Sequence, residues 1–446
     1  MTGVNAHAEA QAQAARAARA SYGRLLALLA SRSGDLGGAE DALAEAFAQA
    51  LKTWPERGVP SNPEAWLLTT ARNRQRDSWR SAASRLDVPL DDDDGATQDD
   101  DMGVHEFKNP ANGALAFQVD PDNIPDQRLK LLFVCAHPAI DAALRAPLML
   151  QVVLGLEAQT IARAFLLPAA TLAQRLVRAK RKIKEAVIPF ALPSRSDMPA
   201  RLEAVLEAIY AAHAIGWEVD RPDASDATPD SDLSDEARYL ADLMVQLNPD
   251  NAEVLGLAAC IALADARRAA RVSADDQYVP LDEQDCTRWD RRLINWGERL
   301  LQRAASLGVP GRFQLEAAIQ SVHNHRADSG HTDWQALALL YEGLMQTAPS
   351  VGAAVGRAVA VGHAQTAEAG LAALDQIVPA LRERFQPAWA ARAHLCAAAG
   401  RRGDAVAAVD RALALTVAPR VRAYLLGQRR RWAVVGVGSV APNATH

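Results

Sequence analysis

The chain has 446 residues, which is long enough for two to four domains, and its formal net charge is −6. This charge excludes a protein that is basic throughout and binds nucleic acid along its whole length. The sequence has no run of about 18 or more apolar residues, so we expect no membrane span. The N-terminal segment lacks the hydrophobic stretch of a secretion signal. The cysteines are far apart and form no CxxC pair, so we expect reduced thiols in a cytoplasmic protein: Cys135, Cys260, Cys286 and Cys396.

The first predicted unit covers residues 16–85 and contains three helices. Apolar residues at helical spacing predict the first helix over 19–31 and the second over 39–53, with glycines between them. A loop rich in proline and glycine follows. Pro63 then opens the third helix, and Asn62 is its expected N-cap.

The second of these helices is amphipathic. Its apolar side chains Leu43, Phe47 and Leu51 are expected to point inward. The outward face is acidic, and it either stays solvated or binds a basic partner. Three carboxylates make up this face: Glu40, Asp41 and Glu45.

Arginines dominate the third helix. Arg72, Arg76 and Arg80 follow one another at four-residue spacing, so they share a face that is suited to phosphates. Trp66 and Trp79 are either core residues or platforms on which an unpaired base stacks, and we expect Trp66 in the core. Two further arginines belong to the same segment, Arg74 and Arg85.

Residues 86–125 are expected to form a linker. The run 87–101 contains eight aspartates and no basic residue. Like charges at this density repel one another, which indicates a disordered segment.

Residues 126–190 form the second predicted unit. Within it, the stretch 156–184 is typical of a helix, a tight turn, a second helix and a basic tail. Pro168 is expected just inside the start of the second helix, where its missing N–H costs nothing. The apolar residues of that helix are spaced four, three and four, and they predict one buried stripe: Leu172, Leu176, Ala179 and Ile183.

The opposite face of the same helix is polar and basic. A DNA-binding helix-turn-helix offers such a face to base edges in the major groove. An ordinary helical hairpin with a solvated basic face is the alternative. The face comprises Thr171, Gln174, Arg175 and Arg178, and the tail adds Lys180, Arg181, Lys182 and Lys184.

Residues 200–435 read as a long run of helices rich in alanine and leucine, interrupted by an Asp-rich loop at 222–234. The sequence LAALD at 371–375 matches VAAVD at 406–410, at an offset of 35 residues. Helix pairs with a period near 34 and small residues at their crossings indicate a tetratricopeptide-like array.

In their order and spacing, these motifs resemble a bacterial alternative sigma factor of the extracytoplasmic-function type. AEDALAEAF at 39–47 is similar to the acidic helix that such sigmas place against the clamp helices of RNA polymerase. NPEAWLLTTARNRQRDSWR at 62–80 resembles the helix behind −10 recognition, and 156–184 resembles the −35-reading helix-turn-helix. DEQDCTRWDRRLINWGERLLQRA, in the second half, resembles the subgroup with a large C-terminal tetratricopeptide-like extension.

The resemblance implies an all-α fold, with sigma domains at 16–85 and 126–190, the linker 86–125, and a helical array at 200–435. It implies promoter-specific initiation of transcription in the cytoplasm, without a cofactor or catalytic residue. Core RNA polymerase and promoter DNA are the implied partners, and a regulatory protein or peptide on the C-terminal domain is a further one.

The resemblance also implies a set of binding residues. Polymerase contacts are assigned to Glu40, Asp41, Glu45 and Phe47. Contacts to −10 DNA are assigned to Arg57, Ser61, Asn62, Arg72, Arg76 and Arg80, although Asn62 either caps its helix or touches a base. Contacts to −35 DNA are assigned to Thr171, Gln174, Arg175, Arg178, Lys180, Arg181 and Lys182.

Other functions fit the residues less well. A one-component regulator with a helix-turn-helix and a tetratricopeptide sensor has no need of the acidic and Arg-rich helices at 39–85. A scaffold with a merely solvated basic segment is a third reading. His323, His325 and His331 have no carboxylate or cysteine at ligand spacing, so we expect no metal there, and no catalytic motif is present. The extension is expected to brace the sigma domains, to activate them or to inhibit them.

Overall fold

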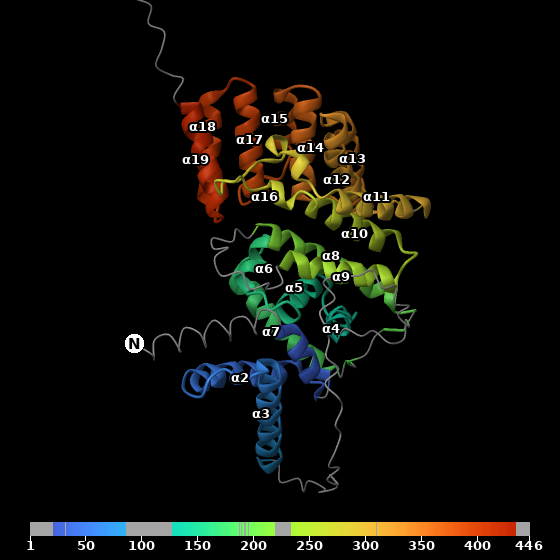
Figure 1. Cartoon of the computed structure of the whole chain (residues 1–446), viewed down its shortest axis with the longest axis vertical. Coiled ribbons are helices and arrows are strands. Elements are labelled where there is room, and N and C mark those ends of the chain that lie inside the picture. Colours follow the sequence, from blue (N-terminus) through green and yellow to red (C-terminus); the bar gives the residue numbers. More distant parts are fainter. Residues whose placement is uncertain are drawn as a thin grey trace, which may run out of the picture. The chain divides into compact units, whose positions relative to one another are not determined.

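The computed structural model describes residues 21–31, 33–85, 127–186, 188, 190, 193–194, 196–218, 233–308 and 310–433. These residues fold as helices joined by turns and short loops, and none of them belongs to a β-strand (Figure 1). An isolated bridge between Val272 and Tyr278 is the exception to purely helical pairing in this part of the chain. The predicted all-α fold is therefore confirmed. The linker predicted at 86–125 lies outside the described residues.

Contacts within the chain define two compact units. The first comprises residues 1–156 and 174–202, and the second comprises 157–173 and 203–446. The boundary at 173–174 falls inside helix α7 (Ala169–Glu185). The four domain ranges taken from the sequence therefore stay predictions.

The first unit begins with a helix over residues 21–31 and continues with α2 (Leu36–Arg57). Asp35 caps α2, because its side chain accepts a hydrogen bond from the Gly38 N–H at 3.0 Å. Helix α2 includes Pro55 and stops at Gly58, whose φ of 82° suits glycine. The prediction of a loop from residue 54 onward is therefore wrong for residues 54–57, which belong to α2. Pro55 is accommodated in the last turn of this helix.

One inward position predicted for α2 is also wrong. Leu51 is 40% exposed. The buried stripe instead runs through Leu43, Ala46, Ala50 and Trp54. The helix continues past residue 53, and the large Trp54 side chain takes the core position at its end.

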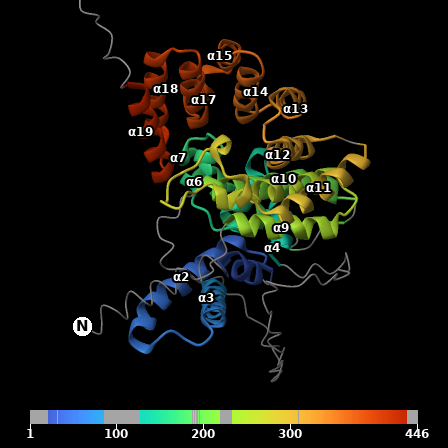
Figure 2. The same ribbon diagram turned by 45° about the horizontal axis from the view of Figure 1, so that its top comes forward.

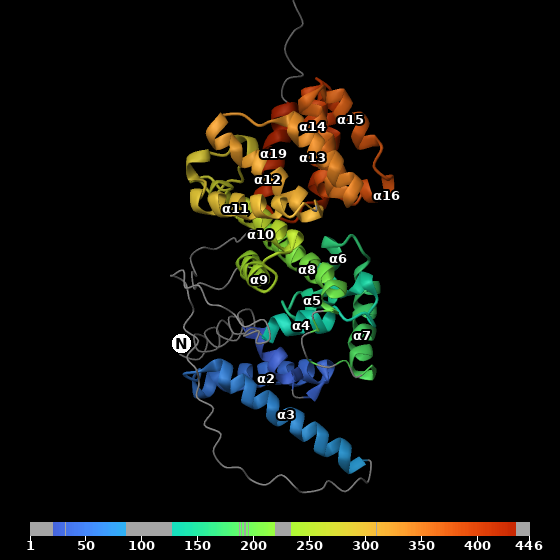
Figure 3. The same ribbon diagram turned by 90° about the vertical axis from the view of Figure 1, so that its right-hand side faces the viewer.

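Helix α3 (Pro63–Arg85) packs against α2, and Figure 3 shows the two helices crossing. Asn62 caps it, with the side-chain oxygen accepting from the Ala65 N–H at 3.0 Å. The Trp66 ring packs edge-on against Trp54, with 5.6 Å between centroids and 66° between planes. This contact supports the core assignment of Trp66. The side chains of Trp79 and Arg85 lie outside the described part.

The next segment forms α4 (Gln127–Cys135), α5 (Ala142–Val152), α6 (Ala158–Ala164) and α7. A tight turn separates α6 from α7, in which Leu166 has a φ of 54° and the Leu167 N–H donates to the Ala162 carbonyl at 2.8 Å. Pro168 precedes α7 rather than lying inside it, and its carbonyl accepts from the Leu172 N–H at 3.0 Å. The predicted stripe of α7 is buried: Leu172, Leu176, Ala179 and Ile183.

Helix α8 (Met198–Glu218) begins in the last residues of the first unit and continues into the second. The second unit goes on with α9 (Leu233–Leu247), α10 (Ala252–Asp265), α11 (Arg291–Ser306) and α12 (Arg312–Ser329). Helix α10 is buried along nearly its whole length between α9, α11 and α12. Short 3₁₀ turns lie between α10 and α11, at Arg268–Ala270 (η2), Leu281–Glu283 (η3) and Cys286–Arg288 (η4).

The last helices stack in chain order, as Figure 2 shows for the array that follows α12. They are α13 (Trp334–Thr347), α14 (Val351–Ala364), α15 (Ala367–Asp375), α16 (Pro379–Arg382), α17 (Gln386–Ala398), α18 (Arg402–Leu415) and α19 (Pro419–Ala433). Each long helix packs on the next, which is the nearest-neighbour arrangement of repeat proteins.

The five-residue repeat occupies equivalent places in α15 and α18. Leu374 and Val409 are both buried. The aspartates that follow them both pair with an arginine of a later helix, Asp375 with Arg392 at 2.7 Å and Asp410 with Arg429 at 2.6 Å. The two copies of the repeat therefore share both a buried apolar residue and an ion pair with a later helix.

A small residue is required where α14 and α15 cross. A Cβ added at Gly370 would lie 2.7 Å from the Ala358 carbonyl oxygen and 2.8 Å from the Gly362 Cα. We expect Gly370→Ala to lower the stability of the array by about 1–3 kcal/mol, because backbone cannot move aside as a side chain can. Gly427→Ala is the control, since nothing lies within 4 Å of its added Cβ. It should stabilise α19 by up to about 1 kcal/mol. Denaturant unfolding measures both, and equal midpoints would contradict the close crossing.

Candidate polymerase and nucleic-acid interface

The acidic face of α2 is divided by burial. Asp41 and Glu45 are exposed, whereas the Glu40 side chain is only 14% exposed and Phe47 is half-buried. Glu40 was predicted to point outward, so its placement differs from the expectation. Glu45 lies 3.3 Å from the Arg74 guanidinium of α3. The free carboxylates of α2 that face solvent are thus fewer than the sequence pattern indicates.

Glu40 pairs with a lysine of the basic helix. Its carboxylate accepts from the Lys180 ammonium at 2.7 Å, and the Lys180 side chain is 17% exposed. Burial raises the pKa of the Glu40 carboxyl above its ordinary value, and Lys180 offsets part of that rise. A residue assigned to polymerase and a residue assigned to DNA therefore neutralise each other in this state.

A second ion pair lies beside the first. The Lys184 ammonium donates to Asp35, the capping residue of α2, at 2.5 Å. Lys184 and the hydrogen bonds of the cap lower the pKa of Asp35, although burial opposes them. Neither Asp35 nor Lys184 belonged to the predicted sites. The run of basic residues ending at 184 was visible in the sequence, but no local pattern connects it to residue 35.

Helix α7 presents its other polar side chains to solvent. Thr171, Gln174 and Arg178 are exposed, as the position of the buried stripe requires. Arg175 is half-buried and donates to Asp141 at 2.9 Å. In the tail Arg181 and Lys182 are exposed, and Arg181 pairs with Glu185 at 3.0 Å.

The turn between α2 and α3 brings the loop residues assigned to −10 DNA next to the Arg-rich helix. Arg57, Ser61 and Asn62 are exposed there. The oxygen of Asn62 is used by the cap, which leaves its amide N–H groups to donate.

The arginines along α3 differ in their surroundings. Arg76 and Arg80 are exposed, and Arg72, one turn earlier, is half-buried. Arg76 also donates to Asn73. The helix therefore combines an exposed basic edge at Arg76 and Arg80 with a core side at Leu67 and Ala71.

No group of three or more histidine, cysteine or acidic side chains among the described residues is arranged to hold a metal ion. His323, His325 and His331 belong to α12 and the turn after it. None of the described helices is long and apolar enough to cross a bilayer.

Comparisons with known proteins identify two regions of the chain. Residues 18–85 match Sigma-70 region 2, and residues 201–305 match a family of unknown function, DUF6596. The first match covers α2, α3 and the preceding helix, and the second covers α8 to α11. No solved structure matches the chain.

One curated relative is similar over most of the chain. The uncharacterized protein R00370 of Rhizobium meliloti (strain 1021) is 34% identical over 388 residues, which cover 87% of this chain and 88% of the relative. The chain therefore belongs to the same protein family as R00370, and the Sigma-70 region 2 at its N-terminus supports a role as a sigma-70 family factor in transcription initiation.

Proposed function

We propose that this protein is an alternative sigma factor of the extracytoplasmic-function type, with a tetratricopeptide-like extension that braces or regulates it. The observation that carries the proposal is the Sigma-70 region 2 match at 18–85, followed in the same chain by the turn-linked helices α6 and α7. A one-component regulator would have no use for region 2. The protein would act in the cytoplasm, without catalysing a reaction itself.

The exposed edge of α2 would bind polymerase. Asp41 and Glu45 offer carboxylates to basic side chains of the polymerase clamp, and the half-buried Phe47 adds apolar contact. Complementary charge mainly speeds and orients such an encounter, while the apolar contact contributes desolvation. Glu40 would join them only after it separates from Lys180.

Strand opening at the −10 element falls to the α2–α3 turn and to α3. The exposed Ser61 and Asn62 can hydrogen-bond to the edge of an unstacked base, and Arg57 can hold a neighbouring phosphate. Arg72, Arg76 and Arg80 would follow the strand along the helix.

Reading of the −35 element falls to α7. Gln174 and Arg175 would contact base edges, each bidentate contact being worth about 1–3 kcal/mol of discrimination. Thr171, Arg178, Arg181 and Lys182 would hold phosphates, which position the helix without reading sequence. Arg175 must exchange its bond to Asp141 for a base, and Lys180 must exchange Glu40 for a phosphate.

The test of the function is transcription in a purified system. With core RNA polymerase and fragmented genomic DNA of the source organism, the full chain should produce transcripts that start at a small set of shared promoter sequences. Core alone gives the background. If the chain adds no promoter-dependent transcript at low salt, the sigma assignment is wrong.

The Lys180–Glu40 pair generates a prediction about DNA binding. Glu40→Gln should release Lys180 for a phosphate, so affinity for duplex DNA without polymerase should rise about threefold to tenfold. The slope of log affinity against log salt should steepen by about 0.9, the value for one more phosphate contact. Fluorescence anisotropy with a labelled duplex measures both quantities.

Asp41→Asn is the matched control. It removes the same charge from the same helix, one residue away, but Asp41 is exposed and takes part in no ion pair between described residues. An equal gain in both variants would mean that overall charge, and not release of Lys180, governs the binding. Circular dichroism confirms that each variant is folded.

A further inference from the structure

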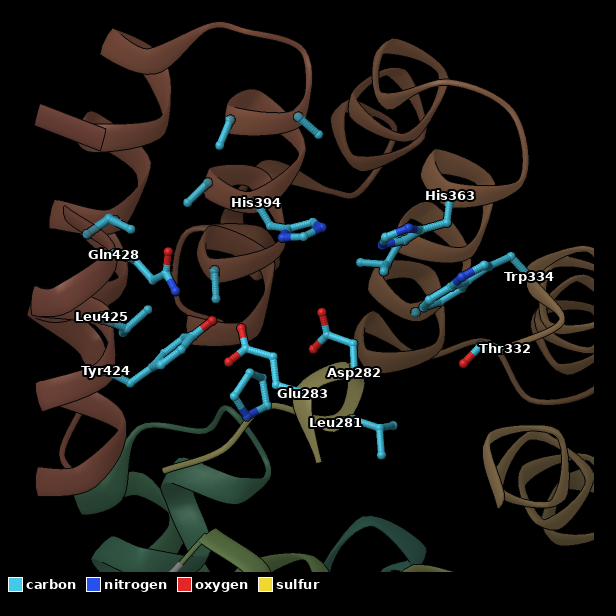
Figure 4. Close-up of a pocket in the computed structure, with 18 of the residues that line it drawn as sticks. Leu281, Asp282, Glu283, Thr332, Trp334, His363, His394, Tyr424, Leu425 and Gln428 are labelled. Carbon is cyan, nitrogen blue, oxygen red and sulfur yellow. The ribbon is translucent and has the colours of Figure 1, made fainter. Parts of the chain in front are cut away.

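The helical array contains a pocket of about 780 Å³. Helices α12, α13, α14, α17, α18 and α19 contribute to its lining, and so does the η3 turn (Figure 4). All of these elements belong to the second unit. None of the residues assigned to polymerase or DNA lines it.

One wall of the pocket is aromatic. The Trp334 ring stacks on His363, with 4.0 Å between centroids and 11° between planes. His394 lies 5.3 Å beyond His363, and Tyr424 faces them from α19 (Figure 4). Burial and the neighbouring His394 lower the pKa of His363, and the Asp282 carboxylate opposes them. The faces of Trp334 and Tyr424 attract cations.

Two carboxylates project into the same space. Figure 4 shows Asp282 and Glu283 rising from η3 between Tyr424, His394 and His363. Neither side chain has a hydrogen bond or an ion pair with another described residue. Together with burial, their charges raise the pKa of Tyr424 to about 12. Two unpaired carboxylates beside aromatic rings suit an ammonium or guanidinium group at this one place in the pocket.

The segment that carries the carboxylates is held by its main chain. Arg326 donates to the carbonyl oxygens of Asp282 and Gln284, both at 2.7 Å. Tyr278 packs edge-on against Tyr424, with 5.5 Å between ring centroids, and Arg420 pairs with Asp276. These contacts fix the turn in the array while its acidic side chains stay free.

The remaining lining leaves space for a backbone. Helix α17 contributes the small residues Ala390, Ala393 and Ala397, and Gln428 and Thr332 offer hydrogen-bonding groups. Extended peptides need such room and such polar partners. Arg402 of α18 and Arg431 of α19 also line the pocket, together with Arg326, so the place that suits a cation is confined to the two carboxylates of η3.

We propose that this pocket binds an extended peptide segment of a partner protein through a lysine or arginine side chain, which lies between Asp282 and Glu283 and against the aromatic wall. The inference builds on the proposed function, because it assigns the regulatory input of the extension to a basic peptide. A partner protein that carries this basic segment would bind the array and would regulate the sigma domains in that way.

The test uses the full chain and two short fluorescein-labelled peptides, one alternating alanine with lysine and the other alternating alanine with glutamate. Anisotropy should show the lysine peptide binding at least about tenfold more tightly. The double variant Asp282→Asn/Glu283→Gln should lose this preference. Asp282→Lys/Glu283→Lys should reverse it, and the reversal separates recognition from simple loss of folding.

A control variant, Glu368→Gln/Asp404→Asn, removes two carboxylates of the array that lie outside the pocket lining. It should keep the preference of the unmodified chain. Equal loss of the lysine preference in this control and in Asp282→Asn/Glu283→Gln would overturn the proposal. Equal binding of the two peptides by the unmodified chain would also overturn it. The assay contains no polymerase, so its failure is distinct from failure of promoter-directed transcription by the same preparations.

Discussion

Helix α7 can bury only one of its faces, and the arrangement of the proposed DNA-reading surface depends on that constraint. Burial of Leu172, Leu176, Ala179 and Ile183 contributes roughly 1.5–3 kcal/mol for each large side chain. The polar residues between them must therefore face outward. Lys180 and Lys184 lie at the edge of the buried stripe, where Glu40 and Asp35 are within reach.

In these two ion pairs, residues of the proposed binding surfaces bind each other. Desolvation offsets much of the attraction within the largely buried Lys180–Glu40 pair, so the pair adds little net stability, and a phosphate could replace the carboxylate without leaving the lysine unpaired. On the proposed function, phosphates take the lysines and polymerase takes the carboxylates. The same charges would then serve the free and the bound state, and the exchange would couple polymerase binding to DNA binding.

The extension follows a different physical rule. Its helices bury their faces against their neighbours, so the array is stable as a stack. The segment between α10 and α11 contributes Asp282 and Glu283 to the pocket, and the other residues that line it are not acidic. Arg326 holds the segment through carbonyl groups, which leaves its carboxylates available to a ligand.

Sequence reasoning predicted what depends on local periodicity. The all-α class, the stripe of α7, the Asn62 cap and the place of the five-residue repeat all follow from spacing along one helix. The end of α2 was missed because Pro55 is tolerated in a last turn, although proline usually ends a helix.

Contacts over long sequence distances could not be predicted. Lys180 and Glu40 are 140 residues apart, and nothing in either segment indicates the other. The place of the acidic η3 turn in the pocket could not be predicted either, because the aromatic residues around it come from α13, α14 and α19. Single-sequence patterns identify faces, but only the fold shows which faces meet.

On the proposed function, α2 binds core RNA polymerase. The dissociation constant of the full chain for purified core polymerase, compared with that of the variant Asp41→Lys/Glu45→Lys, tests this binding directly. We expect a stable complex for the unmodified chain and an affinity at least about tenfold lower for the variant, because the charge of both exposed carboxylates is reversed. Absence of a complex at low salt, or equal affinity of the two proteins, would contradict it.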